Sequence, residues 1–355
     1  MTFVLSFIFL LLVSTSHMMI VFICTLILCS LGMSGNILIL CILLQKHLRI
    51  TFNKLRAALA LFDAMVLGVM LLSQSILTFD KDLHGNVFSY FTWPVWEFSK
   101  AASMFMTVAI AIERLIAVTY PHNYRANRRY RATKYIMSVT IIALAFNLPK
   151  FNEYQPDTSC ENLWCKNYGV TPTDLRRNLG YGIYEIIIFK LLVAKIIPIT
   201  LLVCSYTKIF LTLRKNRKRM EIAENGKSPK EKKTSKQENM ARLFAGVVIT
   251  SLICNIPDVI FNISIITQYP DWYQKLHQWV VTVQKVRNFF MAINSAVNIV
   301  IYSLLSKPFR EECKRAVKRM ISICICHKKS SDGTNDQPQS VAKSNDTELQ
   351  QQSED

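Results

Sequence analysis

Polar and ionisable side chains interrupt long apolar runs of this 355-residue chain, and each of them needs a physical reason. A charge at the centre of a membrane helix costs about 2.5–3.5 kcal/mol on insertion scales. A carboxylate among neutral oxygens suits a small hard cation such as sodium, and the same groups could instead form a structural hydrogen-bond network between helices. The sequence leaves both interpretations open for Asn36, Asp63, Ser103, Asn294, Ser295 and Asn298.

A second set of polar residues lies toward the opposite ends of the same apolar runs. Glu97 and Lys100 are three residues apart and therefore share one helix face. Charges at this depth should face the interior of a helix bundle, where they would line a polar ligand cavity or pair only with one another. Lys195 belongs to this cavity or faces lipid. The predicted cavity residues are Trp96, Glu97, Lys100, Lys190, Asp258, Lys285 and Arg287.

The elements that position these groups are seven apolar runs. A membrane helix needs roughly 20 mainly apolar residues, and this chain is 51% hydrophobic and 19% charged with a mean hydropathy of +0.23. The sequence therefore predicts an all-α membrane protein whose residues 18–305 form a seven-transmembrane helix bundle. The expected spans are residues 18–44, 55–78, 93–118, 134–148, 181–213, 240–267 and 279–305.

Three shorter segments flank the predicted bundle. Residues 1–17 form a short extracellular N-terminus or a weak signal-like segment, and an elongated first helix is an equal alternative. Apolar residues recur at helical spacing between basic residues over 306–329, which predicts a short amphipathic eighth helix on the membrane surface. Residues 330–355 have the composition of a disordered cytoplasmic tail.

The formal net charge of +18 reports membrane topology. Lys and Arg cluster within residues 46–56, 125–134, 214–219 and 227–236, whereas the intervening loops are nearly neutral. The positive-inside rule places the basic loops in the cytoplasm and the N-terminus outside. We therefore expect a multi-pass plasma-membrane protein with a cytoplasmic C-terminus, whose basic charge attracts anionic lipid and not nucleic acid.

Two groups of cysteines lie outside the apolar spans. Cys160 and Cys165 stand in a polar segment that is expected to be extracellular, where a local disulfide can persist. Cys324 and Cys326 end the basic amphipathic segment, and acyl chains on them would anchor it together with the basic patch. Their only neighbouring metal-ligand type is His327, so no metal site is expected.

Several polar residues also arrive in a familiar order. The chain reads Gly35-Asn36, then Leu-Ala-Leu-Phe-Asp over residues 59–63, Glu113-Arg114-Leu115, and Asn-Ile-Val-Ile-Tyr over 298–302. In this order the sequence resembles a rhodopsin-like G protein-coupled receptor from the first span through the eighth helix. The resemblance implies an extracellular ligand, a G protein and arrestin as partners.

By this resemblance, Arg114 is the residue that switches the receptor. Glu113 is expected to hold Arg114 at rest, and the freed arginine would face Tyr206 and the G protein; a buried ion pair without a switching role is the alternative. The remaining members of the expected switch set are Asn255, Pro257 and Tyr302.

Shorter segments show a narrower similarity. Residues 107–109, 147–153, 173–178 and 294–298 resemble invertebrate FMRFamide-type neuropeptide receptors. This implies an amidated peptide ending in Arg-Phe-amide, whose guanidinium would need a carboxylate in the bundle; Glu97 is the preferred partner and Asp258 the second candidate. A chemosensory or orphan receptor for a small molecule, with altered signalling, is the rival interpretation.

Departures from the family pattern affect four positions. Ser89 stands where most relatives have a cysteine at the outer end of the third span, so the usual bond to the second outer loop cannot form. Asn255 replaces a tryptophan, Leu115 a tyrosine and Ile299 a proline. Without that proline the seventh span regains a backbone hydrogen bond and should be straight.

Other function classes fit the sequence less well. The spans hold no histidine cluster and no nucleophile paired with a base, so we expect no enzyme. A transporter would more often show broken helices in two repeated halves, and no such repeat is visible. A retinal-binding photoreceptor needs a lysine in the seventh span at the position of Ala292.

Overall fold

The computed structural model describes residues 15–45, 50–120, 124, 131–157, 165, 169–223, 231–266, 278–305 and 309–315. The chain divides into two compact units, Met1–Arg310 and Glu311–Asp355. The first contains the helix bundle, and in the second residues 311–315 are helical. The expectations for residues 1–14, for Cys160, Cys324 and Cys326, and for the tail from residue 330 fall outside the described residues, as does most of the predicted eighth helix.

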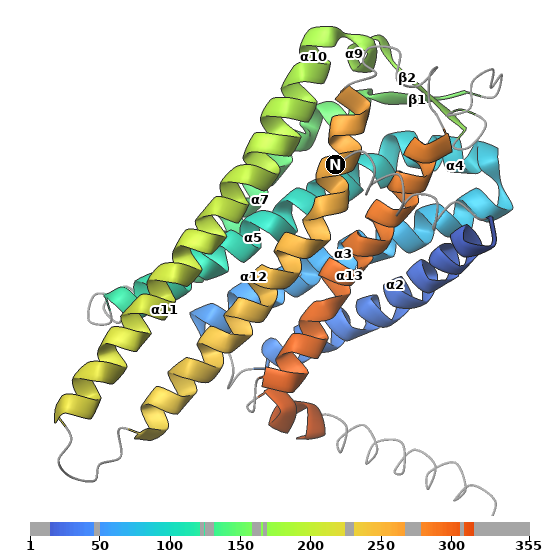
Figure 1. Ribbon diagram of the computed structural model, residues 1–355. Coiled ribbons are helices and arrows are strands. Elements are labelled where there is room, and N and C mark those ends of the chain that lie inside the picture. The colour runs from blue at the N-terminus through green and yellow to red at the C-terminus, as the bar shows by residue number, and fades with distance from the viewer. Residues whose placement is uncertain are drawn as a thin grey trace, which may run out of the picture. The chain divides into compact units, whose positions relative to one another are not determined.

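Long helices of the described chain lie side by side in a bundle (Figure 1), and their contacts close it into a ring. Neighbours in the ring are α2 and α3, then α5, α11, α12 and α13, and α13 packs back against α2; α7 covers α3 and α5 from outside the ring. This arrangement confirms the predicted helical bundle. The bounds are α2 Thr15–Leu43, α3 Thr51–Phe79, α5 Trp93–Thr119, α7 Arg131–Asn147, α11 Ile197–Ala223, α12 Glu231–Ile266 and α13 Gln278–Leu305.

Large apolar side chains point away from the bundle. Ile27, Leu31, Ile141, Leu192 and Leu201 are all exposed, as expected where lipid and not water covers the surface. Among the described residues, six helical segments are long and apolar enough to cross a membrane: Met19–Leu43, Thr51–Ile76, Leu83–Thr119, Arg131–Asn152, Leu179–Lys215 and Ala245–Ile263. Helix α13 carries many polar residues and is not among these six.

The third span begins earlier than the sequence suggested. We expected it to start at Trp93-Pro94, but α4 (Lys81–Val87) and a π-helical turn, η2 (Phe88–Thr92), lead into α5 without a break. Proline inside a helix lacks an N–H and its ring presses on the preceding turn. The wider π-turn directly before Pro94 accommodates that ring, so the helix continues.

The second outer loop is a short hairpin. Helix α7 ends in a 3-10 turn, η3 (Leu148–Asn152), which contains Pro149. Strand β1 (Tyr154–Pro156) then pairs antiparallel with β2 (Val170–Pro172), with Tyr154 opposite Pro172. Short helices α9 (Asp174–Arg177) and α10 (Leu179–Ile183) lead to the fifth span. In Figure 1 the hairpin lies at the same end as α4, α9 and α10.

Glycines let α2 and α13 approach closely. A Cβ atom on Gly32 would lie 2.5 Å from the Cβ of Ala296, and one on Gly35 would lie 3.0 Å from a methyl carbon of Ile299. The Asn36 amide bridges the two helices by donating to the backbone carbonyl of Ser295 at 2.9 Å. Helix α13 runs unbroken through Ile299, and the straightness expected from the missing proline stays a prediction.

Candidate functional site

Three of the predicted ion-site residues meet at Asp63. Ser103 donates to one oxygen of the Asp63 carboxylate and Asn298 to the other, both at 2.7 Å. Ser295 is a further hydrogen-bond partner of the same carboxylate. Helices α3, α5 and α13 each contribute to this buried group, so the residues converge as the sequence predicted.

A small cavity adjoins this carboxylate. It measures about 10 Å³ and is lined by Asp63, Ser103, Thr107, Asn294 and Asn298, among others. That is roughly the space for one water-sized particle. The lining offers carboxylate, hydroxyl and amide oxygens, which are the donors that a hard cation prefers. The residues present therefore fit a single sodium ion in both size and donor type.

Toward the outer side of the pocket at Asp63, a π-helix directs three charged side chains of the fifth span to one side. The π-helix η4 spans Tyr184–Ile196 and holds Glu185, Lys190 and Lys195 at intervals of five residues. In an α-helix, residues five apart point about 140° away from each other. A π-helix bonds each N–H to the carbonyl five residues back, so side chains five apart become neighbours on one face. All three side chains are buried.

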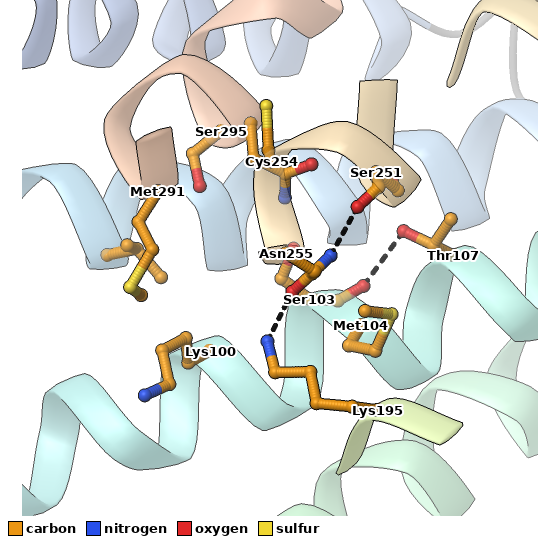
Figure 2. Close-up of a pocket in the computed structure, with 12 residues that line it drawn as sticks. Lys100, Ser103, Met104, Thr107, Lys195, Ser251, Cys254, Asn255, Met291 and Ser295 are labelled. Atoms are coloured by element: carbon orange, nitrogen blue, oxygen red, sulfur yellow. Dashed lines mark hydrogen bonds between the residues drawn. The ribbon is translucent and has the colours of Figure 1, made fainter. Parts of the chain in front are cut away.

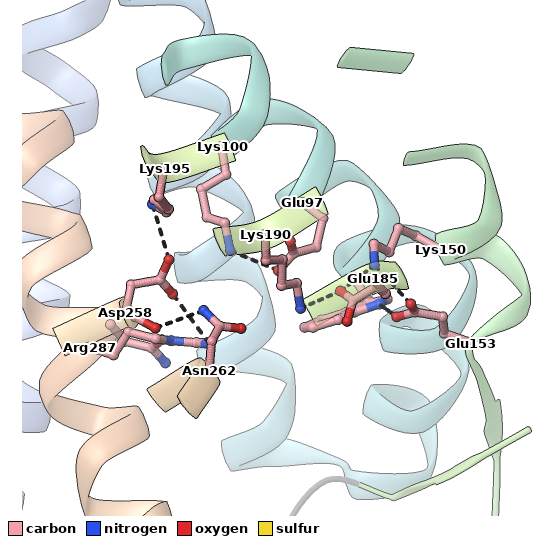
Figure 3. A network of polar contacts seen from close by, with 12 residues as sticks. Glu97, Lys100, Lys150, Glu153, Glu185, Lys190, Lys195, Asp258, Asn262 and Arg287 are labelled. Atoms are coloured by element: carbon pink, nitrogen blue, oxygen red, sulfur yellow. Dashed lines mark hydrogen bonds and ion pairs between the residues drawn. The ribbon is translucent and has the colours of Figure 1, made fainter. Parts of the chain in front are cut away.

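Glu185 is the centre of the first charged cluster, drawn in Figure 3. Its carboxylate lies 2.6 Å from the ammonium of Lys150, 2.6 Å from that of Lys190 and 2.8 Å from the guanidinium of Arg176. Burial disfavours the charge on Arg176, but the carboxylates of Glu185 and Glu153 outweigh that effect and hold its pKa above the usual value. Side chains of the fifth span, of η3 and of α9 thereby become one buried unit.

Glu153 ties the outer loop to the same cluster. It accepts hydrogen bonds from the Trp93 indole at 2.8 Å, from the Tyr181 hydroxyl at 2.6 Å and from Lys150 at 2.8 Å. Its side chain is fully buried. Because Trp93 opens α5 and Tyr181 lies in α10, this carboxylate joins the third span, the loop and the fifth span.

A second charged cluster joins the fifth, sixth and seventh spans. The Asp258 carboxylate lies 3.0 Å from the Lys195 ammonium and 3.8 Å from the Arg287 guanidinium. Lys195 also donates to the amide oxygen of Asn255. Lys195 is therefore buried in the bundle, and its alternative interpretation as a lipid-facing residue is wrong.

Glu97 and Lys100 share a helix face, as predicted, and bond to each other at 2.8 Å. The Lys100 ammonium also lies 5.0 Å from the ring centre of Trp96, and the Arg287 guanidinium lies 5.1 Å from the same ring. Trp96 thus contacts both cations. These outer charges are paired with one another in the structure. This agrees with the interpretation in which they pair only with one another and do not line an open ligand cavity.

Lys285 does not join these clusters. Its side chain is exposed, whereas Arg287 is buried. Residues two apart on an α-helix point about 160° away from each other, so only one of the two can face the bundle interior. The prediction that Lys285 lines the cavity is wrong for this reason.

A deep cavity of about 30 Å³ lies between the outer charges and the ion pocket (Figure 2). Lys100 and Lys195 line its outer part, and neutral polar groups together with the apolar side chains of Val66, Met104 and Met291 line the rest. Four residues, Ser103, Thr107, Ser251 and Asn294, line both this cavity and the pocket at Asp63. The ligand-facing and ion-facing parts of the bundle therefore share their walls.

The pair Glu113 and Arg114 differs from expectation. Within the described residues no ion pair joins them: Glu113 accepts a hydrogen bond from the Tyr124 hydroxyl at 2.8 Å, and the Arg114 guanidinium lies 3.0 Å from the ring centre of Phe52. Adjacent residues on a helix point about 100° apart, and each side chain here has found a different partner. Burial and the bond to Glu113 both raise the pKa of Tyr124, which therefore stays protonated.

The other expected switch residues differ in what surrounds them. Asn255 is buried, accepts from Lys195 and donates to the Ser251 carbonyl at 2.6 Å. Pro257 lies inside α12. Tyr206 and Leu115 pack against the same apolar cluster of α5, α11 and α12. Tyr302 belongs to α13, but its side chain lies outside the part that the structure describes.

Cys165 forms a disulfide. Cys160 falls outside the described residues, so the pairing of these two cysteines stays a prediction.

Aromatic packing and a close backbone contact hold the hairpin against the start of the third span. Ser89 is buried and donates to the Gly85 carbonyl of its own helix at 2.9 Å. The Tyr154 ring packs against Trp93 and Phe88, with ring centres 5.2 and 5.8 Å apart. A Cβ atom on Gly85 would lie only 2.2 Å from the Gly169 carbonyl oxygen. We term these contacts the outer clasp: the packing of Tyr154 on Trp93 and Phe88, the approach of Gly85 to Gly169, and the Trp93–Glu153 hydrogen bond.

The prediction of cavity residues missed the Glu185 cluster. Glu185 is an ionisable residue in an apolar span, and that signal alone marked it as a group needing partners. Its partners Lys150 and Arg176, and Glu153 that pairs with both, come from the turn η3, the loop after it and the short helix α9, where charges are ordinary and give no such signal.

Comparison with known families gives one match that covers most of the chain. The sequence matches the family described as 7 transmembrane receptor (rhodopsin family) over residues 35–302.

Among curated relatives, the FMRFamide receptor of Drosophila melanogaster is 27% identical and aligns with 79% of this chain and 50% of its own length. The neuropeptide Y receptor type 6 of Mus musculus is 24% identical over 83% of this chain and 78% of its own. The neuromedin-U receptor 2 of Mus musculus is 24% identical over 82% and 74%. The chain spans about half the length of the Drosophila receptor.

Proposed function

Because the chain belongs to the rhodopsin family of seven-transmembrane receptors, we propose that it binds an extracellular peptide and activates an intracellular heterotrimeric G protein. Membership of a receptor family also agrees with the expectation that the chain is not an enzyme. The observation that carries the proposal is the shared wall between the deep cavity and the pocket at Asp63. A group that enters from the outer side must disturb residues that also surround Asp63.

The same core offers a route for the signal toward the inner side. Asn255 in α12 contacts Lys195 of the fifth span, and it also contacts Ser251, which lies one turn earlier in the same helix. Pro257 lies two residues beyond Asn255 and removes one backbone hydrogen bond from α12. A ligand that shifts Lys195 therefore acts on the weakest part of that helix. At the inner end, Arg114 rests on Phe52 and must leave that ring to contact a G protein.

The relatives that are named as receptors for peptides favour an amidated peptide as the ligand. The FMRFamide, neuropeptide Y and neuromedin-U receptors are the named relatives. A groove of about 410 Å³ on the outer hairpin, lined by Tyr90, Phe151, Tyr154, Asp174 and Arg177 among others, has the size of a ligand site. We place this end outside the cell and the C-terminus in the cytoplasm of a plasma-membrane receptor. Acyl chains on Cys324 and Cys326 and arrestin binding at the tail belong to the same proposal.

Expression in cells with a panel of amidated neuropeptides tests this function. At least one peptide should raise calcium or change cyclic AMP in transfected cells and leave untransfected cells silent. A response to small non-peptide molecules alone would contradict the peptide proposal and favour the small-molecule alternative.

We also propose a sodium site at Asp63. Asp63 and the oxygens of Ser103, Asn294 and Asn298 would hold the ion, which supplies positive charge to a buried carboxylate and stabilises the resting state. Replacing potassium by sodium should then lower agonist affinity and raise the melting temperature of the purified wild-type receptor. Asp63→Asn should abolish both effects.

The sodium test has a matched control in Asn36→Ala. Asn36 is a buried amide of the same core whose hydrogen bonds go to backbone carbonyls, so this variant should keep the sodium effect. Equal sodium dependence in wild type and Asp63→Asn would remove the assignment.

A further inference from the structure

Cations outnumber carboxylates in the buried outer network of the described residues. Six cationic side chains and four carboxylates are joined by ion pairs, which leaves two formal positive charges in excess. An uncompensated charge in a low-dielectric interior is costly. The cations are Lys100, Lys150, Arg176, Lys190, Lys195 and Arg287, and the carboxylates are Glu97, Glu153, Glu185 and Asp258.

One of these two excess positive charges lies beside the deep cavity. Around that cavity, Glu97 pairs with Lys100, whereas Asp258 alone serves both Lys195 and Arg287. The two charged side chains that line the cavity are Lys100 and Lys195, and no carboxylate of the described residues lines it. The remaining polar lining, Ser103, Asn255, Asn294 and Ser295 among others, is neutral (Figure 2). The cavity wall is therefore cationic.

The size of the cavity limits what can enter. Its volume of about 30 Å³ has room for roughly two or three water-sized groups. A carboxylate is of that size, whereas several residues of a peptide are not. A ligand that reaches the cavity in this state must insert one small terminal group past the ion pairs of Glu97 and Asp258.

We propose that the ligand carries an acidic group that inserts between Lys100 and Lys195. This inference rests on the proposed function and names the chemistry of the ligand. The acid supplies the missing negative charge and competes with Asp258 for Lys195. As Lys195 turns toward the ligand, its bonds to Asp258 and Asn255 of α12 break. Binding is thereby coupled to release of the sixth span from the fifth.

A ligand arginine finds no comparable place. Glu97 is 2% exposed and bonded to Lys100, so a guanidinium would have to displace that lysine inside a network that already has excess positive charge. The pairing of Glu97 with a ligand arginine, expected from the resemblance, is therefore disfavoured electrostatically. An arginine elsewhere in the peptide, outside the bundle, is compatible with the structure.

Two matched series of synthetic amidated peptides test the proposal. Each peptide of the first series carries one Asp or Glu, and its counterpart carries Asn or Gln at the same position. Calcium and cyclic AMP are read in cells that express the full-length receptor. For active peptides, the acid should be roughly ten- to hundredfold more potent than its amide counterpart, because a charge-assisted contact in the cavity is lost.

Variants that remove both partners of one ion pair locate the contact. The change at Asp258 also removes the carboxylate beside the buried Arg287, so potencies are compared at matched surface expression. Lys195→Gln combined with Asp258→Asn, and Lys100→Gln combined with Glu97→Gln, should each reduce the preference for acid to less than about threefold. Lys195→Arg should keep it. Lys285→Gln is the control, since it removes an exposed lysine of α13 and should leave the preference intact. Surface expression is measured for every variant.

The outcomes separate this inference from the proposed function. Active peptides with equal potency in both series would overturn the acidic group while leaving the peptide receptor in place, and this comparison needs no variant. A preference that persists in both paired variants at normal surface expression would overturn its location between Lys100 and Lys195. If no peptide of either series is active, the proposed function fails and the inference fails with it.

Discussion

Replacing Glu185 with glutamine should remove most of the receptor from the cell surface. The side chain is 1% exposed and binds three cations at 2.6–2.8 Å. Glutamine keeps the shape but leaves Lys150, Arg176 and Lys190 with Glu153 as the main remaining carboxylate. Breaking a buried ion pair by removing one partner costs about 3–5 kcal/mol, which is a large share of the stability of a folded protein.

Surface labelling of a tagged receptor and thermal unfolding in detergent measure this effect. Asp174→Asn is the matched control because Asp174 is an exposed carboxylate of α9 in the same outer region. It should leave both quantities near wild type. Normal surface expression of Glu185→Gln, with an unchanged melting temperature, would show that the buried cluster is not required for folding.

Adding a single methyl group to Gly85 should displace the outer hairpin. In Gly85→Ala the new Cβ would lie 2.2 Å from the Gly169 carbonyl oxygen, a backbone atom that cannot rotate away. That carbonyl also accepts a hydrogen bond from the Asp157 amide at 3.1 Å, and Gly169 has a φ of 67°, so the turn has little freedom to adjust. Overpacking of this kind typically costs about 1–3 kcal/mol.

Hydrogen exchange measures the displacement. Amides of β1 and β2 should exchange roughly ten times faster in Gly85→Ala, as expected for a loss of about 1.4 kcal/mol of local stability. Gly68→Ala is the matched control: its Cβ would meet only the sulfur of Met33, at 3.4 Å. Both changes favour the helix by similar amounts, so a difference between them reports the hairpin contact. Equal exchange in both variants would mean that the clasp does not hold the loop.

Much of the bundle was predictable from the sequence because a membrane imposes few solutions. Apolar runs of about 20 residues must be helices in lipid, and polar groups inside them must turn inward. This logic placed Asp63, Ser103 and Asn298 together, and the structure joins them by direct hydrogen bonds.

The parts that could not be predicted depend on local helix geometry. The sequence does not reveal that residues 184–196 form a π-helix, and an α-helix would have turned Glu185, Lys190 and Lys195 to different sides. The predicted start of the third span was wrong for a similar reason, since the π-turn before Pro94 lets the helix continue.

Partner choice was the second source of error. Glu113 and Arg114 stand side by side in the sequence, yet the carboxylate bonds to Tyr124 and the guanidinium lies on Phe52. Both partners come from neighbouring segments, and competition among several possible partners is decided by distances that a sequence does not contain.

Nucleotide exchange by a purified G protein tests the central claim most directly. Membranes with the wild-type receptor should accelerate guanine-nucleotide exchange when an active amidated peptide is added, and Arg114→Gln should retain less than about a tenth of that acceleration while binding the peptide. Arg114→Gln removes the charge that we assign to the G protein contact, and it lies far along α5 from Glu97 and Lys100. Exchange that is unaffected by the peptide with every G protein class, or equal acceleration by wild type and Arg114→Gln, would contradict the account.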